Sequence, residues 1–430
     1  MSDKTGISWT NATWNPVTGC TKVSQGCKHC YAEREWVRLS ANPKSVAYYG
    51  RKFTDVACHP ERLDQPLRWS KPRMIFVNSM SDLFHEDVPD AFIDRVFAVM
   101  ALAPQHIFQV LTKRQERMKT WLDAAHDNQE RAVGQVMREI AAARGGDDAG
   151  LPEWPLPNVW LGVSIEDQAT ADERIPLLLQ TPAAVRWVSA EPLLDFIDLE
   201  RVLWPNKGGH RVDVLRGGYW NKANCMALGP SADLGEAKGG YTNHLDFPAT
   251  LDWVVIGGES GPNARPMHIE WVDKLRIDCQ KAEVPFFMKQ LGAAFVDEKN
   301  GIVGASLKVD PDVACMVSRK LQDRAGADME EWPEYLRVRE WPKEISDDDI
   351  AVDGFAAVMK AKMAASRGKG RFGWQTASSA HLTYLLVEHL EKGDPVDVAN
   401  FAMMLHQNGQ SVDKIVVQAY RKSIKDKIHE

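Results

Sequence analysis

Long apolar runs and a secretory leader are both missing from this sequence. No stretch of the 430-residue chain approaches the ~20 consecutive apolar residues that a membrane-spanning helix needs. The first residues, MSDKTGISWT, lack the basic, apolar and small-residue parts of a secretory signal. We therefore expect a cytoplasmic protein that has no membrane partner.

Cysteine is scarce and its number is odd, which excludes a disulfide scaffold. The chain has seven cysteines, and four of them are scattered without regular spacing: Cys58, Cys225, Cys279 and Cys315. Structural disulfides are rare in a reducing compartment. The thiols are therefore expected to be free and available as metal ligands.

An excess of positive charge is also absent. The 52 Lys and Arg residues are outnumbered by 59 Asp and Glu residues, and the net charge is -7. This balance excludes a protein that coats nucleic acid over its whole surface, but it leaves a local basic groove open. Fifteen tryptophans are present, mostly beside strand-like or Pro-rich segments, and we expect them to pack in the core.

Seven segments have the composition of β-strands. In all but the first, which is the segment GISWTNATWNPV before the cysteines, apolar, β-branched or aromatic residues run continuously and small polar or charged residues follow. Continuous hydrophobicity predicts strands that are covered on both faces, as in a parallel sheet. The segments begin near Gly6, Met74, Ile107, Val159, Val185, Trp253 and Phe286.

Helix-like segments alternate with these strands. Residues Asp90–Ala103 and Ile269–Ala282 carry apolar residues at three- and four-residue steps, the spacing of an amphipathic helix. Repeated strand and helix units predict right-handed βα crossovers. The fold class expected is therefore α/β, with an open or partial (β/α) barrel.

Composition divides the chain into two predicted domains. Residues 1–346 form the barrel domain, and residues 347–430, with several helical runs, form a small all-α accessory domain. In this tail Pro395 is placed at a helix start and Gly409 at a helix end. Two stretches of the barrel domain, about 122–157 and 200–250, interrupt the alternation of strand and helix segments. We interpret them as loop insertions that either carry substrate selectivity or only decorate the surface.

Polar residues follow each predicted strand. In barrels of parallel strands, functional groups lie at the carboxyl ends of the strands. Any one of these residues alone is better explained by a helix cap or a loop, but six ends converging beside a cysteine cluster favour a site. They are Asn78, Ser79, Ser81 and Asp82; Thr112, Lys113 and Arg114; Ser164, Glu166 and Asp167; Ser189 and Glu191; Gly257, Gly258, Glu259 and Ser260; and Lys289 and Gln290.

The segment GCTKVSQGCKHCYAE holds three cysteines, Cys20, Cys27 and Cys30. A closed zinc site needs a fourth protein ligand, and the candidates are His29, Cys58 and His59. A [4Fe-4S] cluster held by three cysteines instead leaves one iron open to an exogenous ligand. Architecture and spacing together favour the cluster, and zinc is the alternative.

Several segments resemble one family in the same order along residues 5–295: TWNPVTGCTKVSQGCKHCYAER, FVNSMSDLFHEDVP, LTKR, WLGVSIED and IGGESGPNARP. This is a bacteriophage and prophage family of unknown function with a three-cysteine motif. The family in turn resembles the radical S-adenosylmethionine (SAM) superfamily. Six residues separate the first two cysteines here, whereas the superfamily most often has three, and NSMSD replaces its usual Gly-Gly-Glu.

The superfamily resemblance implies a (β/α)6 partial barrel, a [4Fe-4S] cluster and SAM as cofactors, and an external one-electron reductant as partner. Cleavage of SAM would give a 5'-deoxyadenosyl radical that abstracts hydrogen from the substrate. By position, Cys20, Cys27 and Cys30 would bind the cluster, and His29 would lie near the adenine. The other SAM contacts implied are Asn78, Ser79, Ser81, Asp82, Ser164, Glu166, Gly257 and Gly258. The candidates for binding substrate or the SAM carboxylate are Lys113, Arg114, Glu191, Glu259, Arg265 and Lys289.

The function expected from this resemblance is a radical-SAM-like enzyme of phage or prophage origin that acts on a nucleotide or a nucleic acid base. The alternative is a non-enzymatic module, stabilised by zinc or a cluster, that binds nucleic acid or protein. The tail weakly resembles phage proteins related to dATP/dGTP pyrophosphohydrolases. Its acidic residues Glu388, Glu391, Asp394 and Asp397 lack those enzymes' spacing for Mg²⁺, so we interpret the tail as a module that docks a protein partner or regulates the enzyme.

Overall fold

The computed structural model describes residues 5–124, 130–144, 154–204, 210–220, 241–243, 249–304, 316–342, 355, 358–359, 362–363 and 365–429. The helices are α1 (Tyr31–Ser40), α2 (Asp90–Leu102), α3 (Gln115–Ala124), α4 (Glu130–Ala143), α5 (Gln168–Leu179), α6 (Ile269–Lys281), α8 (Ser379–Glu391), α9 (Pro395–Gln407) and α10 (Lys414–His429). The strands of the main sheet are β1 (Ala12–Trp14), β4 (Met74–Val77), β5 (Ile107–Thr112), β6 (Val159–Ile165), β7 (Val185–Ala190), β12 (Trp253–Gly257) and β14 (Phe286–Gln290).

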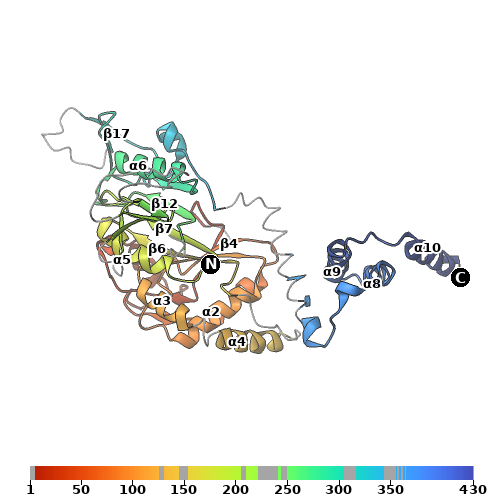
Figure 1. Cartoon of the computed structure of the whole chain (residues 1–430). Coiled ribbons are helices and arrows are strands. Elements are labelled where there is room, and N and C mark those ends of the chain that lie inside the picture. The colour runs from red at the N-terminus through yellow and green to blue at the C-terminus, as the bar shows by residue number, and fades with distance from the viewer. Residues whose placement is uncertain are drawn as a thin grey trace.

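The main sheet is seven-stranded and parallel, in the order β1-β4-β5-β6-β7-β12-β14. These are the seven strands predicted from the sequence. The sheet curls into a half-barrel, and α2, α3, α5 and α6 lie around its outside (Figure 1). The prediction of an α/β fold with an open barrel of parallel strands is therefore confirmed at this level.

The two faces of the sheet are buried in two different ways. Residues such as Ile75, Val110 and Val188 point to the helices and belong to the larger core. Their neighbours along the strands line the concave face, which is rich in aromatic side chains. This inner core consists of Trp9, Met74, Phe76, Trp160, Val185, Trp187, Trp253, Val255 and Phe287. Because both faces are covered, the strand sequences are continuously apolar.

The concave face changes character toward the carboxyl ends of the strands. Trp187 is followed on the same face of β7 by Ser189, and Phe287 is followed on β14 by Lys289. Gly162 makes room for the indole of Trp187, because a Cβ there would lie 2.5 Å from its ring. The concave face of the half-barrel is therefore aromatic along most of the strands and polar at their carboxyl ends. We call the aromatic inner core the aromatic floor, and the polar carboxyl ends of the strands the polar mouth.

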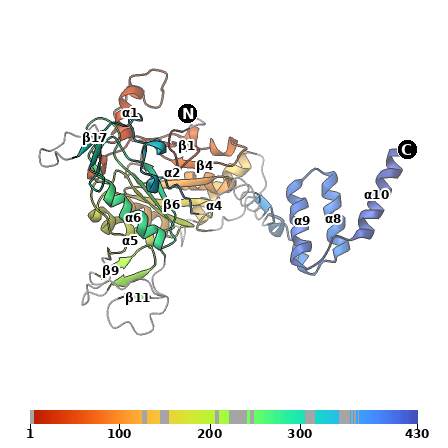
Figure 2. The same cartoon turned by 90° about the horizontal axis from the view of Figure 1, so that it is seen from above.

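The two predicted insertions contain regular structure. The first includes α4, whose apolar residues Val133 and Met137 are buried in the larger core. The second contains an antiparallel sheet in the order β11-β10-β9-β8, seen at one side in Figure 2. Its strands are β8 (Val202–Trp204), β9 (His210–Asp213), β10 (Gly218–Trp220) and β11 (Tyr241–Asn243). In the described residues between β7 and β12, this sheet takes the place of a crossover helix.

Two smaller sheets were not anticipated from the sequence. Strands β2 (Val17–Thr18) and β3 (Ala57–Cys58) pair beside the cysteine motif. A four-stranded sheet follows the order β13-β15-β16-β17. Its strands are β13 (Met267–His268), β15 (Phe295–Asp297), β16 (Ile302–Gly304) and β17 (Val317–Arg319).

The C-terminal region is helical, as predicted. Asp394 caps α9 by accepting hydrogen bonds from the backbone of Val396 and Asp397, and Pro395 is the first residue of that helix. Gly409 follows α9 with a φ of 65°. In the predicted helical run 354–367, the described residues 355, 358–359, 362–363 and 365–367 are helical, and the other six lie outside the described residues. No helix in the described ranges is long and apolar enough to cross a membrane.

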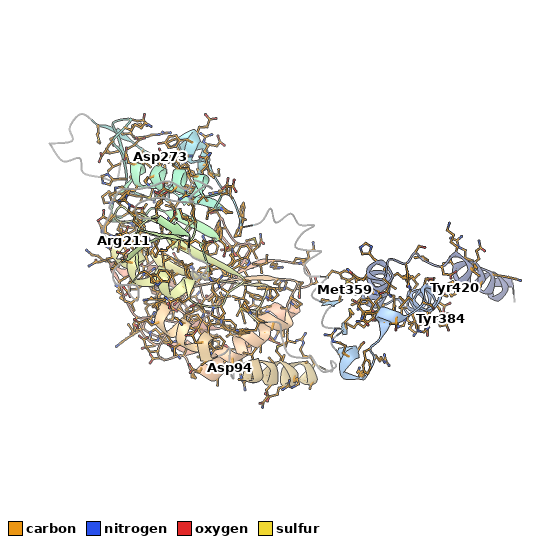
Figure 3. The ribbon with its side chains drawn as sticks, in the orientation of Figure 1. Asp94, Arg211, Asp273, Met359, Tyr384 and Tyr420 are labelled. Atoms are coloured by element: carbon orange, nitrogen blue, oxygen red, sulfur yellow. The ribbon has the colours of Figure 1, made fainter. Side chains whose placement is uncertain are left out.

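Asp94 on α2, labelled in Figure 3, gives the fold a predicted pH dependence. Burial raises the pKa of its carboxyl to about 6. Because this folded-state pKa is above the unfolded value of about 4, ionisation favours the unfolded chain, so this contribution to stability falls as the pH rises between those values. We expect Asp94→Asn to stabilise the protein at pH 7.5 by about 1–2 kcal/mol, and not at pH 4, as measured by urea unfolding. An equal effect at both pH values would contradict this prediction.

Candidate functional site

The segment from Gly19 to Arg34, named here the cysteine loop, lies across the carboxyl edge of the half-barrel. At one end, Gly19 forms a β-bridge with Ser81, just after β4. In the middle, the hydroxyl of Ser24 donates to Oε1 of Glu166 after β6, at 3.1 Å. Further on, Nδ1 of His29 lies 2.9 Å from Oε2 of Glu259 after β12. The loop therefore contacts strand ends from one side of the sheet to the other.

The three thiols of this loop are free and half-buried. Cys20 follows β2, Cys27 ends a 3-10 turn over Gln25–Cys27, and Cys30 is the N-cap of α1. Burial raises the pKa of Cys20 to about 12, and the negative charge of Asp82 adds to this effect. Burial also raises the pKa of Cys30, and the neighbouring Cys27 adds a smaller increase to the pKa of both Cys20 and Cys30.

Hydrogen-bond donors surround two of these sulfurs. Nη1 of Arg114 donates to Sγ of Cys20 at 3.6 Å, and the hydroxyl of Ser24 lies 3.9 Å from Sγ of Cys27. The positive charge of Lys113 acts on Cys30 and favours its thiolate, against the larger effect of burial, which raises the pKa of this cysteine. Donors and cations at the sulfurs are the surroundings that an anionic thiolate centre requires.

All three nitrogens of the Arg114 guanidinium donate hydrogen bonds to other groups of the protein. Nε donates to Glu86 at 3.0 Å, Nη1 also donates to Asp82 at 3.3 Å, and Nη2 donates to the carbonyl and hydroxyl of Thr21 at 3.2 and 2.9 Å. We predicted Arg114 as a binder of substrate or of the SAM carboxylate. In this structure, it holds the start of the cysteine loop to the strands.

Glu166 is the centre of a buried ion network. Its side chain is fully buried, and its carboxylate lies 3.1 Å from Nζ of Lys113 and 3.1 Å from Nη1 of Arg174. A Cβ on Gly26 would lie 2.4 Å from Oε1 of Glu166. The glycine therefore allows the cysteine loop to pass directly over this carboxylate.

Glu191 and Lys289 form a second pair at the mouth. Nζ of Lys289 lies 3.1 Å from Oε1 of Glu191, and Ser189 donates to its Oε2 at 3.1 Å. A Cβ on Gly257 would lie 2.4 Å from Oε1 of the same carboxylate. A Cβ on Gly258 would lie 2.1 Å from the backbone oxygen of Leu291. Both glycines are therefore required by close approach within the protein.

Glu259 anchors the far end of the cysteine loop. It accepts hydrogen bonds from Nε and Nη2 of Arg265 at 3.1 and 2.5 Å, in addition to its contact with His29. Burial alone raises the pKa of Glu259, but the hydrogen bonds from Arg265 bring it below the usual range. Arg265 also donates to the carbonyl of Gln25, and Arg34 donates to that of Ser260.

The residues after β4 also hold the loop. Ser81 donates to the carbonyl of Val17 at 2.8 Å, and Ser79 donates to Asn15 while its own carbonyl accepts from the hydroxyl of Tyr31. Asp82 accepts from Thr112, from the backbone of Lys113 and from Arg114. Asn78, which has a φ of 61°, is buried, and its Nδ2 has no hydrogen-bond partner in the described structure.

The structure thus brings all eighteen predicted site residues to the polar mouth or to the loop above it. Ser164 completes the set, buried on β6 with its carbonyl accepting from Arg174 at 2.7 Å. Sequence reasoning missed Arg174. It belongs to the buried stripe of α5 that also includes Ala171, Ile175 and Leu178. An arginine at a core position of an amphipathic helix is a signal that a buried carboxylate lies nearby.

No group of three or more His, Cys, Asp or Glu side chains within the described ranges is arranged to hold a single metal ion. In a [4Fe-4S] cluster, each cysteine binds its own iron, so the sulfurs surround a volume rather than one ion. The free thiols and the hydrogen-bond donors beside them fit such a group. The residues present are therefore compatible with the cluster implied by the sequence motif.

Comparison with protein families gives a match over most of the chain. Residues 4–366 match the family described as "Protein of unknown function (DUF5131)". No curated protein matches the chain. No solved structure matches it either.

Proposed function

We propose that this chain, which belongs to the DUF5131 family of proteins of unknown function, is an iron-sulfur enzyme that binds SAM at the mouth of its half-barrel. The observation that carries the proposal is the position of the cysteine loop. Three free, half-buried thiols are held over the carboxyl ends of parallel strands, where barrel proteins place their functional groups.

In this proposal, Cys20, Cys27 and Cys30 hold a [4Fe-4S] cluster. When bound, the cluster supplies an open iron site for SAM and, after reduction by an external donor, the electron that cleaves SAM to a 5'-deoxyadenosyl radical. Arg114 and Ser24 donate to or lie beside the ligand sulfurs, which stabilises their anionic form. The aromatic floor gives the proposed site an apolar, buried border on the side of the strands.

Charged side chains at the mouth supply the contacts for the zwitterionic part of SAM and for the substrate. Lys289 and Lys113 are each partly exposed, at 23% and 18% of their side chains, and each is paired with a carboxylate. Either ammonium can turn to the carboxylate or phosphate of a ligand, because Glu166 would keep its ion pair with Arg174 and Glu191 would keep its hydrogen bond from Ser189. The side chain of Arg174 is only 3% exposed, so its guanidinium cannot turn from Glu166 to a ligand in the same way.

The substrate class proposed is a nucleotide or a nucleic acid base. It rests on the resemblance to phage and prophage proteins, and the two lysines at the mouth agree with an anionic ligand. A phage or prophage origin is part of the same proposal.

Anaerobic purification and reconstitution test the function directly. We expect about four irons and four sulfides per chain, broad visible absorbance, and slow formation of 5'-deoxyadenosine from SAM after chemical reduction, even without substrate. Iron and sulfide analysis, absorbance and chromatography of the nucleoside products are the measurements.

Stoichiometric zinc without sulfide would contradict the proposal and favour the alternative of a non-enzymatic binding module. An intact cluster that leaves SAM uncleaved would restrict the cluster to electron transfer or to a structural role. In either case, 5'-deoxyadenosine would be absent from the reaction.

A further inference from the structure

The chain is acidic as a whole, but one stretch near its C-terminus contains no acidic residue. No Asp or Glu occurs from Gly354 to Val387, whereas five Lys or Arg residues do. Within it, the segment Arg367–Phe372, RGKGRF, concentrates three of these cations; it is named here the basic loop. Such a local excess of positive charge on a protein of net charge -7 is typical of a site that binds a polyanion.

All residues of the basic loop are exposed to solvent. Phe372 exposes 80% of its surface, the second-largest exposure among the large hydrophobic residues of the described structure. The acidic residues of the neighbouring helices are engaged elsewhere, since Asp394 and Asp397 lie within ion-pair distance of Lys362, and Glu388 pairs with Lys392. Each of these three carboxylates therefore has a cation from outside the basic loop as a partner.

The basic loop has a defined conformation. The backbone of Arg371 donates to the carbonyl of Ser366 at 3.0 Å, and Gly370 and Gly373 have φ values of 75° and 93°. Just beyond it, Asn408 and Gln410 donate to the carbonyls of Trp374 and Ala377. These bonds tie the loop to the end of α9, so Phe372 is presented to solvent by an ordered turn.

Exposed cations that alternate with glycine beside an exposed aromatic ring match the chemistry of single-strand recognition. Lys and Arg track the phosphates, and an aromatic ring stacks on a base whatever its identity. A duplex hides the faces of its bases, so the exposed ring of Phe372 adds affinity only for an unpaired strand. A purely electrostatic surface would not need this ring.

We propose that the basic loop binds single-stranded nucleic acid, with Arg367, Lys369 and Arg371 on the phosphates and Phe372 stacked on a base. This inference does not depend on the proposed iron-sulfur chemistry. It assigns to the helical tail the role of recruiting a nucleic acid strand to the protein.

Fluorescence anisotropy of a labelled 15-nucleotide oligothymidylate, titrated with the full-length protein at several salt concentrations, tests the inference. Phe372→Ala is expected to weaken binding by about 5- to 100-fold, the range of one lost stacking contact. The triple variant Arg367→Gln, Lys369→Gln, Arg371→Gln is expected to reduce the slope of log K against log salt by about 2. Because these side chains are exposed, both variants should keep the circular dichroism spectrum of the parent protein.

A matched control removes three exposed cations far along the chain, in the variant Arg38→Gln, Lys44→Gln, Lys71→Gln, which should keep the parent affinity. A duplex of the same length should bind more weakly than the single strand and should not respond to Phe372→Ala. Absence of binding by the parent protein at low salt, equal losses in the control variant, or an unchanged affinity in Phe372→Ala would each overturn the proposal.

Discussion

Replacing Cys27 with alanine is expected to abolish cluster binding and SAM cleavage. In the proposed site, each of the three cysteines holds one iron, so the loss of any one removes a required ligand. Cys27 is the clearest test because it is half-buried and is a neighbour that contributes to the raised pKa of both other cysteines. Iron and sulfide per chain, visible absorbance and 5'-deoxyadenosine should all fall close to background.

The matched control for this variant is Cys58→Ala. Cys58 is another half-buried free cysteine, and it lies on β3, which pairs with β2 just before the cysteine loop. It should keep the full iron content and activity. If Cys27→Ala retains iron and sulfide, or if Cys58→Ala loses them to the same extent, the three-cysteine site is wrong. Circular dichroism of both apo-proteins separates loss of the ligand from loss of the fold.

Glu166→Ala is expected to lower the free energy of unfolding by about 3–5 kcal/mol, the usual cost of breaking a buried ion pair by removing one partner. The substitution leaves Arg174, which is 2% exposed, without its carboxylate. It also removes the acceptor of Ser24 under the cysteine loop. Urea unfolding of the apo-protein, followed by tryptophan fluorescence, measures the loss.

The same variant should loosen the cysteine loop. Alkylation of Cys27 in the folded apo-protein is expected to become faster in Glu166→Ala than in the parent. Glu116→Ala, at an exposed position of α3, provides the control and should change stability by less than about 0.5 kcal/mol. The double variant Glu166→Gln, Arg174→Met should recover part of the stability, because it removes both buried charges together. A loss in Glu166→Ala no larger than that in Glu116→Ala would show that the network does not stabilise the fold.

Much of the fold could be predicted from local sequence because the strands are buried on both faces. Their continuous apolar runs identified six of the seven strands of the main sheet, and β1 was placed in the segment before the cysteines. The helices α2 and α6 followed from their three- and four-residue spacing. The antiparallel sheet β8–β11 was missed, because short strands within a Gly-rich segment carry no such periodic signal.

The sequence by itself determined which residues are gathered at the mouth, because parallel strands deliver their carboxyl ends to one edge and the polar residues follow the strands directly. Only the tertiary structure decided which carboxylate pairs with which cation. Arg114 faces Cys20 rather than open space, and Arg174 reaches Glu166 from the buried side of α5. These pairings join segments far apart in the chain, and their geometry depends on the curl of the sheet and on the path of the cysteine loop, which local patterns do not encode.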